Sequence, residues 1–137
     1  MDDGMKEWWR QELLWSVRWL AADPEAALAA APGVVTTDEI ALDLDHWSMM
    51  ARDWALLDGP SLALLDEIDR EFASMSDADR PELWEDVALS TTPEWLAQRA
   101  RARALLDLMG EQRADARLGD PRPGGPVYAF QGQRRSR

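Results

Sequence analysis

The sequence predicts an all-α fold, a compact bundle of about five to six helices. Ala and Leu are far more frequent than the β-branched residues Val, Ile and Thr, a balance that favours helices over strands. Hydrophobic residues make up 46% of the 137 residues and charged residues 30%, which is enough apolar material for a packed core. Apolar side chains also recur every three or four residues along most of the chain. We expect one helical domain over residues 1–118 and a flexible, basic, Pro/Gly-rich tail over residues 119–137.

The first helix is expected over residues 5–22, with Trp15 and Trp19 on its apolar face. Glu12 falls inside the same apolar arc, so a carboxylate is expected to enter the core or an interface and to require a donor. Arg99, on the last predicted helix, is a candidate for that donor.

Trp8 and Trp9 lie side by side near the start of this first helix. Adjacent helical residues point about 100° apart, so both indoles cannot be buried equally deeply. One of them is a candidate for an exposed anchor or a homodimer contact. The alternative is a wide buried arc continued by the tryptophans that follow.

The second and third helices have start signals in the sequence. Pro24, after Asp23, suits a first helical position, and this short helix is expected to stop at Pro32. Thr36 and Glu39 have the spacing of a capping box, which predicts a third helix running to about residue 58. Its core stripe is expected to be Ile40, Leu44, Trp47, Ala51 and Trp54.

Three further helices are predicted after a break at Gly59-Pro60. Ser61 is a candidate cap for the fourth, whose apolar stripe is Leu65, Ile68, Phe72 and Met75. A short helix is expected over residues 81–89. The last helix, with Thr91 and Glu94 at capping-box spacing, is expected to run to about residue 110.

Charge and composition exclude several classes of protein. The chain has no cysteine, which excludes disulfide scaffolds, cysteine-ligated zinc, iron–sulfur clusters and thiol catalysis. The formal net charge is −11 at pH 7, which argues against general nucleic-acid binding. The charge is uneven: nine basic and 24 acidic residues up to position 111 give −15, and six basic and two acidic residues beyond it give +4.

No phosphate-binding loop, nucleophile elbow or zinc-protease motif is present, so we expect neither an enzyme nor a cofactor. The sequence contains no apolar stretch suited to a signal peptide or a membrane span. We therefore expect a cytoplasmic protein that does not bind membranes.

The candidate binding site is an acidic face on the predicted third helix. If these acids converge on one outward patch, their field would attract a basic protein surface. Trp47 or Trp54 would supply an aromatic anchor, and core packing is the alternative role for both. The predicted partner-binding residues are Asp38, Glu39, Asp43, Asp45, Trp47, Asp53 and Trp54, with Asp58 contributing to the field.

Two further clusters of charged residues suggest other roles. Glu39, Asp43 and Asp53 lie within about 80° of His46 on a helical wheel, an arrangement that could hold a divalent metal. Di-metal bundles need a second histidine, which the chain lacks, and a solvated polar face is the ordinary alternative.

The basic cluster Arg99, Arg101 and Arg103 is too small and too close to acidic residues for nucleic-acid recognition. We expect it to form internal pairs instead, for example between Arg103 and Asp107.

In size, charge and lack of catalytic motifs, the chain resembles small acidic bacterial immunity proteins and antitoxins. This resemblance lies in bulk properties and not in a motif. It implies a module that masks the basic surface of a partner protein. A homo-oligomeric structural or adaptor bundle, with contacts through Trp8 or Trp9, is the alternative.

Overall fold

The computed structural model describes residues 2–30 and 35–111, and these residues form helices and turns without any strand. The all-α prediction is therefore confirmed for them, whereas the predicted tail over residues 119–137 lies outside the described ranges. In chain order the elements are α1 (Asp3–Ala21), α2 (Pro24–Ala30), α3 (Thr36–Ser48), α4 (Gly59–Asp77), the 3-10 helix η1 (Pro81–Trp84), α5 (Ala88–Thr91) and α6 (Pro93–Leu108).

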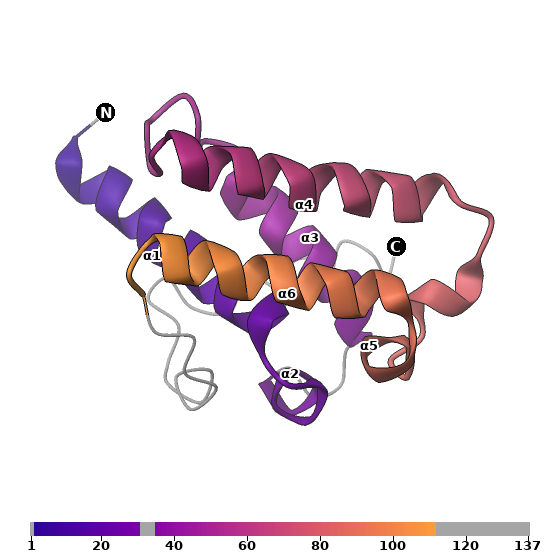
Figure 1. Ribbon diagram of the computed structural model, residues 1–137. Coiled ribbons are helices and arrows are strands. Elements are labelled where there is room, and N and C mark those ends of the chain that lie inside the picture. The colour runs from indigo at the N-terminus through magenta and orange to yellow at the C-terminus, as the bar shows by residue number, and fades with distance from the viewer. Residues whose placement is uncertain (1, 31–34, 112–137) are drawn as a thin grey trace, which may run out of the picture.

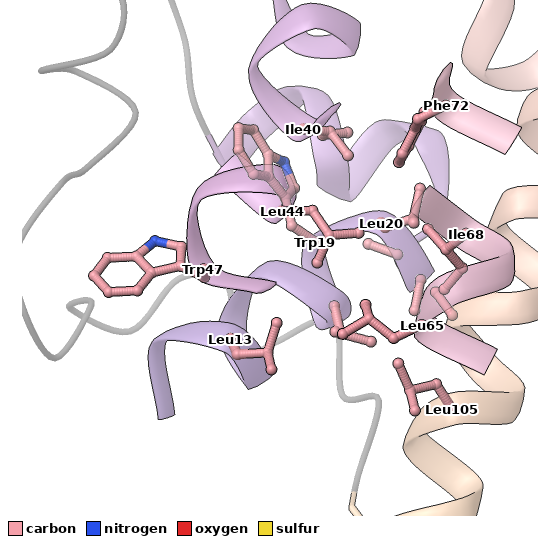
Figure 2. Close-up of a cluster of buried hydrophobic side chains, with 14 of the residues drawn as sticks. Leu13, Trp19, Leu20, Ile40, Leu44, Trp47, Leu65, Ile68, Phe72 and Leu105 are labelled. Atoms are coloured by element: carbon pink, nitrogen blue, oxygen red, sulfur yellow. The ribbon is translucent and has the colours of Figure 1, made fainter. Parts of the chain in front are cut away.

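Helix α1 forms the centre of the packing, because it contacts α2, α3 and α6. Helices α4 and α6 run side by side, and α3 contacts both α1 and α4 (Figure 1). The shared core contains leucine and isoleucine side chains from all the long helices, together with large aromatic rings (Figure 2).

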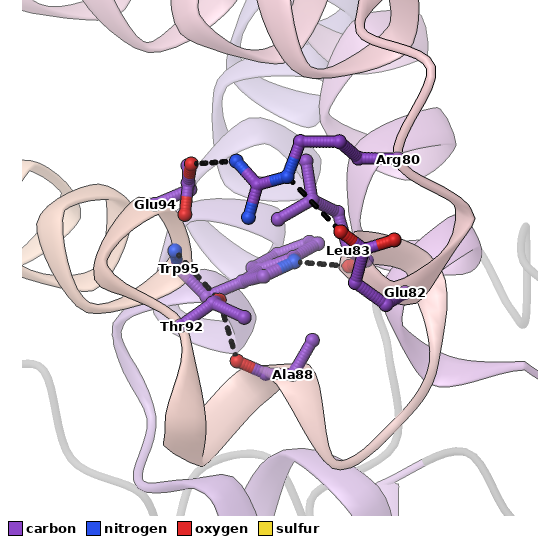
Figure 3. A network of polar contacts seen from close by, with 7 residues as sticks. All are labelled: Arg80, Glu82, Leu83, Ala88, Thr92, Glu94 and Trp95. Carbon is purple, nitrogen blue, oxygen red and sulfur yellow. Dashed lines mark hydrogen bonds and ion pairs between the residues drawn. The ribbon is translucent and has the colours of Figure 1, made fainter.

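Buried tryptophans need acceptors for their indole N–H groups, and two such bonds connect separate elements. The Nε1 of Trp19 donates to the carbonyl of Ala27 at 2.9 Å, which fixes α2 against α1. The Nε1 of Trp95 donates to the carbonyl of Leu83 at 2.7 Å, which fixes η1 against α6 (Figure 3).

Helix α3 ends at Ser48, ten residues earlier than predicted. Residues 49–55 form consecutive turns, and Ala55 has a φ of 51°, a left-handed conformation that a helix cannot contain. The predicted stripe nevertheless continues in space, because Ala51 is buried and Trp54 is half-buried. Periodic burial therefore extended beyond the helix itself.

The predicted caps are displaced by a few residues. Helix α4 begins at Gly59, and the N-cap is Asp58, not Ser61: its carboxylate accepts the Ser61 N–H at 2.9 Å. This hydrogen bond is also the main cause of the lowered pKa of Asp58. Similarly, Thr92 and not Thr91 caps α6, and its hydroxyl donates to the carbonyl of Ala88 at 2.8 Å (Figure 3).

The predicted helix over residues 81–89 is also wrong, because the segment splits into η1 and α5. The reason is its packing against the start of α3. The carboxylate of Asp86 accepts the Thr36 N–H at 3.0 Å, and the Thr37 hydroxyl donates to the carbonyl of Trp84 at 2.5 Å. The side-chain cap of α3 therefore comes from residue 86, and Val35 stands at the N-cap position without a side-chain bond.

An ion-pair network centred on Arg80 holds this end of the molecule together. The guanidinium contacts Glu94 of α6 at 2.5 Å and Glu82 of η1 at 3.1 Å (Figure 3). It joins the segment after α4 to the first turn of α6. The network lies at the surface, and its role is to hold these segments together.

Candidate functional site

The predicted acidic face of α3 does not form one outward patch. Glu39 and Asp43 are only 1% and 0% exposed, so the prediction that they face solvent is wrong. Helix α3 contacts both α1 and α4, and its buried arc is therefore wider than the apolar stripe and includes these two positions.

A third carboxylate, Glu12 of α1, is also fully buried, as the sequence predicted. Glu12, Glu39 and Asp43 all have interaction partners within the structure. They belong to the interior polar contacts of the fold and are not available to a partner protein.

The remaining predicted acids are dispersed. Asp38 is half-buried in the first turn of α3, whereas Asp45 is exposed near its last turn. Asp53 is exposed in the turn that follows the helix, and Asp58 is committed to capping α4. Of the predicted acids, only Asp45 and Asp53 line the same surface hollow in the described part of the chain.

These two aspartates line a surface hollow of about 400 Å³ between the end of α3, the following turn and α4. Two further aspartates of α4, Asp66 and Asp69, line it as well. We call this feature the acidic hollow. Its lining residues are Asp45, Ser48, Met49, Ala51, Arg52, Asp53, Leu62, Leu65, Asp66 and Asp69.

Four aspartates and one arginine line the acidic hollow within the described part of the chain, so negative charge is in excess there. Burial, together with the neighbouring Asp45 and Asp66 carboxylates, raises the pKa of Asp69 to about 6. Arg52 forms an ion pair with Asp66. A cation entering the hollow would favour the ionised form of Asp69.

A cluster of aromatic rings adjoins the acidic hollow. It comprises Trp8 and Trp9 of α1, His46 and Trp47 of α3, and Trp54 of the turn, and we call it the aromatic cluster. Trp9 lies at its centre: its ring centroid is 4.8 Å from that of Trp47, 5.4 Å from Trp54 and 5.6 Å from His46. His46 and Trp54 directly follow Asp45 and Asp53, two residues of the hollow, so the two features are contiguous along the chain.

The two predicted aromatic anchors differ in exposure. Trp47 is only 1% exposed, so its predicted role as an exposed anchor is wrong; it packs at the edge of the core, apart from Leu65 and Leu105 (Figure 2). Trp54 is half-buried. Trp8 is 36% exposed, which makes it the more open member of the Trp8–Trp9 pair.

The histidine of the candidate metal site is part of the aromatic cluster. Its ring stacks on Trp9 with 20° between the planes and meets Trp47 edge to face at 4.6 Å. Within residues 2–30 and 35–111, no group of three His, Asp or Glu side chains is placed to hold a metal ion.

The arginines of the basic cluster on α6 make hydrogen bonds within the protein. Arg99 donates to the carbonyl of Leu89, where Glu12 was its expected partner. Arg101 donates to the side-chain oxygen of Gln98 at 2.8 Å.

Arg103 bonds the carbonyl of Ala21 at 2.9 Å and the carboxylate of Asp23 at 2.8 Å, in place of the predicted pair with Asp107. These two bonds join α6 to the connection between α1 and α2.

Asp66 and Asp69 were missed by reasoning from the sequence. They directly follow Leu65 and Ile68 of the α4 core stripe, so they border that stripe, where acidic residues are ordinary on an amphipathic helix. Only the crossing of α4 against the end of α3 places them opposite Asp45 and Asp53.

None of the helices in the described ranges combines the length and hydrophobicity needed to cross a membrane. Comparison of the chain with protein-family models, with curated proteins and with solved structures finds no match.

Proposed function

We propose that this protein is a non-catalytic, acidic helical module that binds a basic partner protein and masks part of its surface. The observation that carries the proposal is the acidic hollow, in which four aspartates from three segments line one concavity. A concentrated negative field of this kind speeds encounter with a basic surface and selects among partners.

The aromatic cluster supports the same proposal, because charge alone gives weak binding at physiological salt. Tight interfaces usually combine charge complementarity with a few large side chains that become fully desolvated. Trp8 and Trp54 are partly open to solvent, and Met49 at the rim of the hollow is 61% exposed. These side chains would supply the apolar contact and the aspartates the charged contact.

Binding of this type would act by occlusion. A partner whose active surface is basic would lose access to its own substrate while the module covers it, as immunity proteins and antitoxins do for toxins. A cytoplasmic location belongs to the same proposal.

The test uses a fluorescein-labelled hexa-arginine peptide as the basic probe. We expect the triple variant Asp45→Asn, Asp53→Asn, Asp69→Asn to bind the peptide at least about tenfold more weakly than the unmodified chain. The matched control replaces three exposed acids away from the hollow, Asp3→Asn, Glu25→Gln and Asp77→Asn, and has the same net charge. Equal losses of affinity in both triple variants would contradict the proposal.

A homo-oligomeric bundle is the second candidate function, favoured by one observation. Met5 and Trp8 are three residues apart on α1 and are both exposed, at 40% and 36%. A symmetric contact through this turn would bury both side chains. Sedimentation at micromolar concentration would then give a multiple of 15.5 kDa that Trp8→Ala returns to the monomer mass.

A further inference from the structure

We propose that Arg52 is an internal competitor for the acidic hollow, and that a cationic side chain of the basic partner displaces it on binding. This inference rests on the proposed function and assigns a regulatory role to one residue of the same site. Among the described residues that line the hollow, Arg52 is the only cation.

The first support is the position of Arg52. It lies in the turn after α3, and its guanidinium reaches across to the carboxylate of Asp66 on α4. A guanidinium of the chain itself therefore already occupies the side of the hollow that α4 forms.

The second support is that this ion pair is open to solvent. The side chains of Arg52 and Asp66 are 63% and 42% exposed. Exposed pairs are weak and are screened by salt, so an incoming cation can replace Arg52 without breaking a buried contact. Because the Arg52 backbone lies in a turn and not in a helix, its side chain can swing outward without disrupting an element.

The third support is the excess of acid that remains when Arg52 is in place. Asp45, Asp53 and Asp69 line the hollow, and no ion pair within the described part of the chain involves any of them. A partner's cation that entered would contact these carboxylates as well as Asp66. The incoming charge therefore has more favourable contacts available than Arg52 uses.

Competition of this kind would make binding selective. A partner surface with a single cation would gain little binding free energy after displacing Arg52. A partner surface that inserts one cation and presents others around it would gain more binding free energy. Arg52 would thus raise the threshold for binding and discriminate against weakly basic proteins.

The experiment compares Arg52→Gln with Arg70→Gln, using the same hexa-arginine peptide and fluorescence anisotropy. Arg70 is exposed on α4, lines a separate, smaller hollow, and its replacement changes the net charge equally. We expect Arg52→Gln to bind the peptide about threefold to fivefold more tightly than Arg70→Gln does. Equal affinities of the two variants would overturn the inference.

A double-variant cycle gives a second test that does not depend on one substitution. In an Asp66→Asn background Arg52 has lost its ion-pair partner. Arg52→Gln should then no longer increase the affinity for the peptide beyond that of the Arg70→Gln control. Persistence of the full gain in that background would contradict competition at Asp66.

The outcomes also separate this inference from the proposed function. If the unmodified chain binds through Asp45, Asp53 and Asp69 but Arg52→Gln and Arg70→Gln behave alike, only the role of Arg52 fails. If the hollow triple variant and its control bind the peptide alike, both fail.

Discussion

The indole of Trp9 meets the indole of Trp54 edge to face, with 5.4 Å between the ring centroids and 80° between the planes. This contact joins the start of α1 to the turn after α3, which forms one wall of the acidic hollow. The shape of the hollow therefore depends on aromatic packing as well as on the helices.

Replacing Trp9 by Ala should destabilise the protein by about 2 to 4 kcal/mol, because four ring contacts are lost and a cavity forms at the centre of the aromatic cluster. Trp8→Ala should cost only about 1 kcal/mol, because Trp8 is partly exposed and lies at the edge. Urea unfolding followed by circular dichroism measures both. Equal losses would show that Trp9 is not the centre of the cluster.

Asp69 should make stability depend on pH in a defined direction. Its pKa is raised to about 6 in the folded protein, mainly by burial and also by Asp45 and Asp66, so the folded state favours the protonated form. The stabilisation from protonation is present at pH values below its unfolded pKa of about 4 and is lost as pH rises through about 6.

Asp69→Asn should therefore stabilise the protein at pH 7.5 by about 1 kcal/mol, since part of the side chain is solvated, and should have little effect at pH 4. Thermal unfolding of the two proteins at both pH values is the measurement. Asp77→Asn, an exposed change on the same helix, serves as the control and should show no such difference. Destabilisation at pH 7.5 would contradict the assignment.

Glu12→Gln should lower stability by about 1 to 3 kcal/mol, because the carboxylate is fully buried and has interaction partners in the fold. Glu67→Gln changes the same group at an exposed position and should be nearly neutral. Identical melting temperatures for the two variants would show that the buried charge contributes nothing.

Asp86→Ala should destabilise the protein by about 1 kcal/mol, since it removes the side-chain acceptor for the first N–H of α3. Asp79→Ala, an exposed aspartate in the preceding connection, is the matched control. Hydrogen exchange at the Thr36 amide should accelerate in the first variant and not in the second. An unchanged exchange rate would mean that the hydrogen bond from the Thr36 amide to Asp86 does not stabilise the start of α3.

The long helices were predictable because each has an apolar stripe at helical spacing. Periodicity failed after Ser48, where turns keep Ala51 buried as a continuing helix would, and over residues 81–89, which split into η1 and α5. The cap of α3 could not be found locally, because its acceptor is Asp86, fifty positions away.

The candidate site was only partly predictable, for a geometric reason. A helical wheel places Glu39 and Asp43 close to Asp53, but it cannot tell how much of the helix its neighbours cover. Glu39 and Asp43 are buried and therefore do not belong to the surface site. Helix α3 ends at Ser48, so Asp53 lies in the following turn and not on the helix. Asp66 and Asp69 entered the site through the contact between α3 and α4, which no single-helix pattern contains.

The measurement that tests the central claim most directly is the position of a bound basic probe. A nitroxide-labelled hexa-arginine peptide broadens the NMR amide signals of residues close to it. We predict selective broadening at Asp45, Asp53 and Asp69, with the amides of Glu25 and Asp77 unaffected. Broadening spread evenly over exposed acids, or centred away from the acidic hollow, would contradict the account.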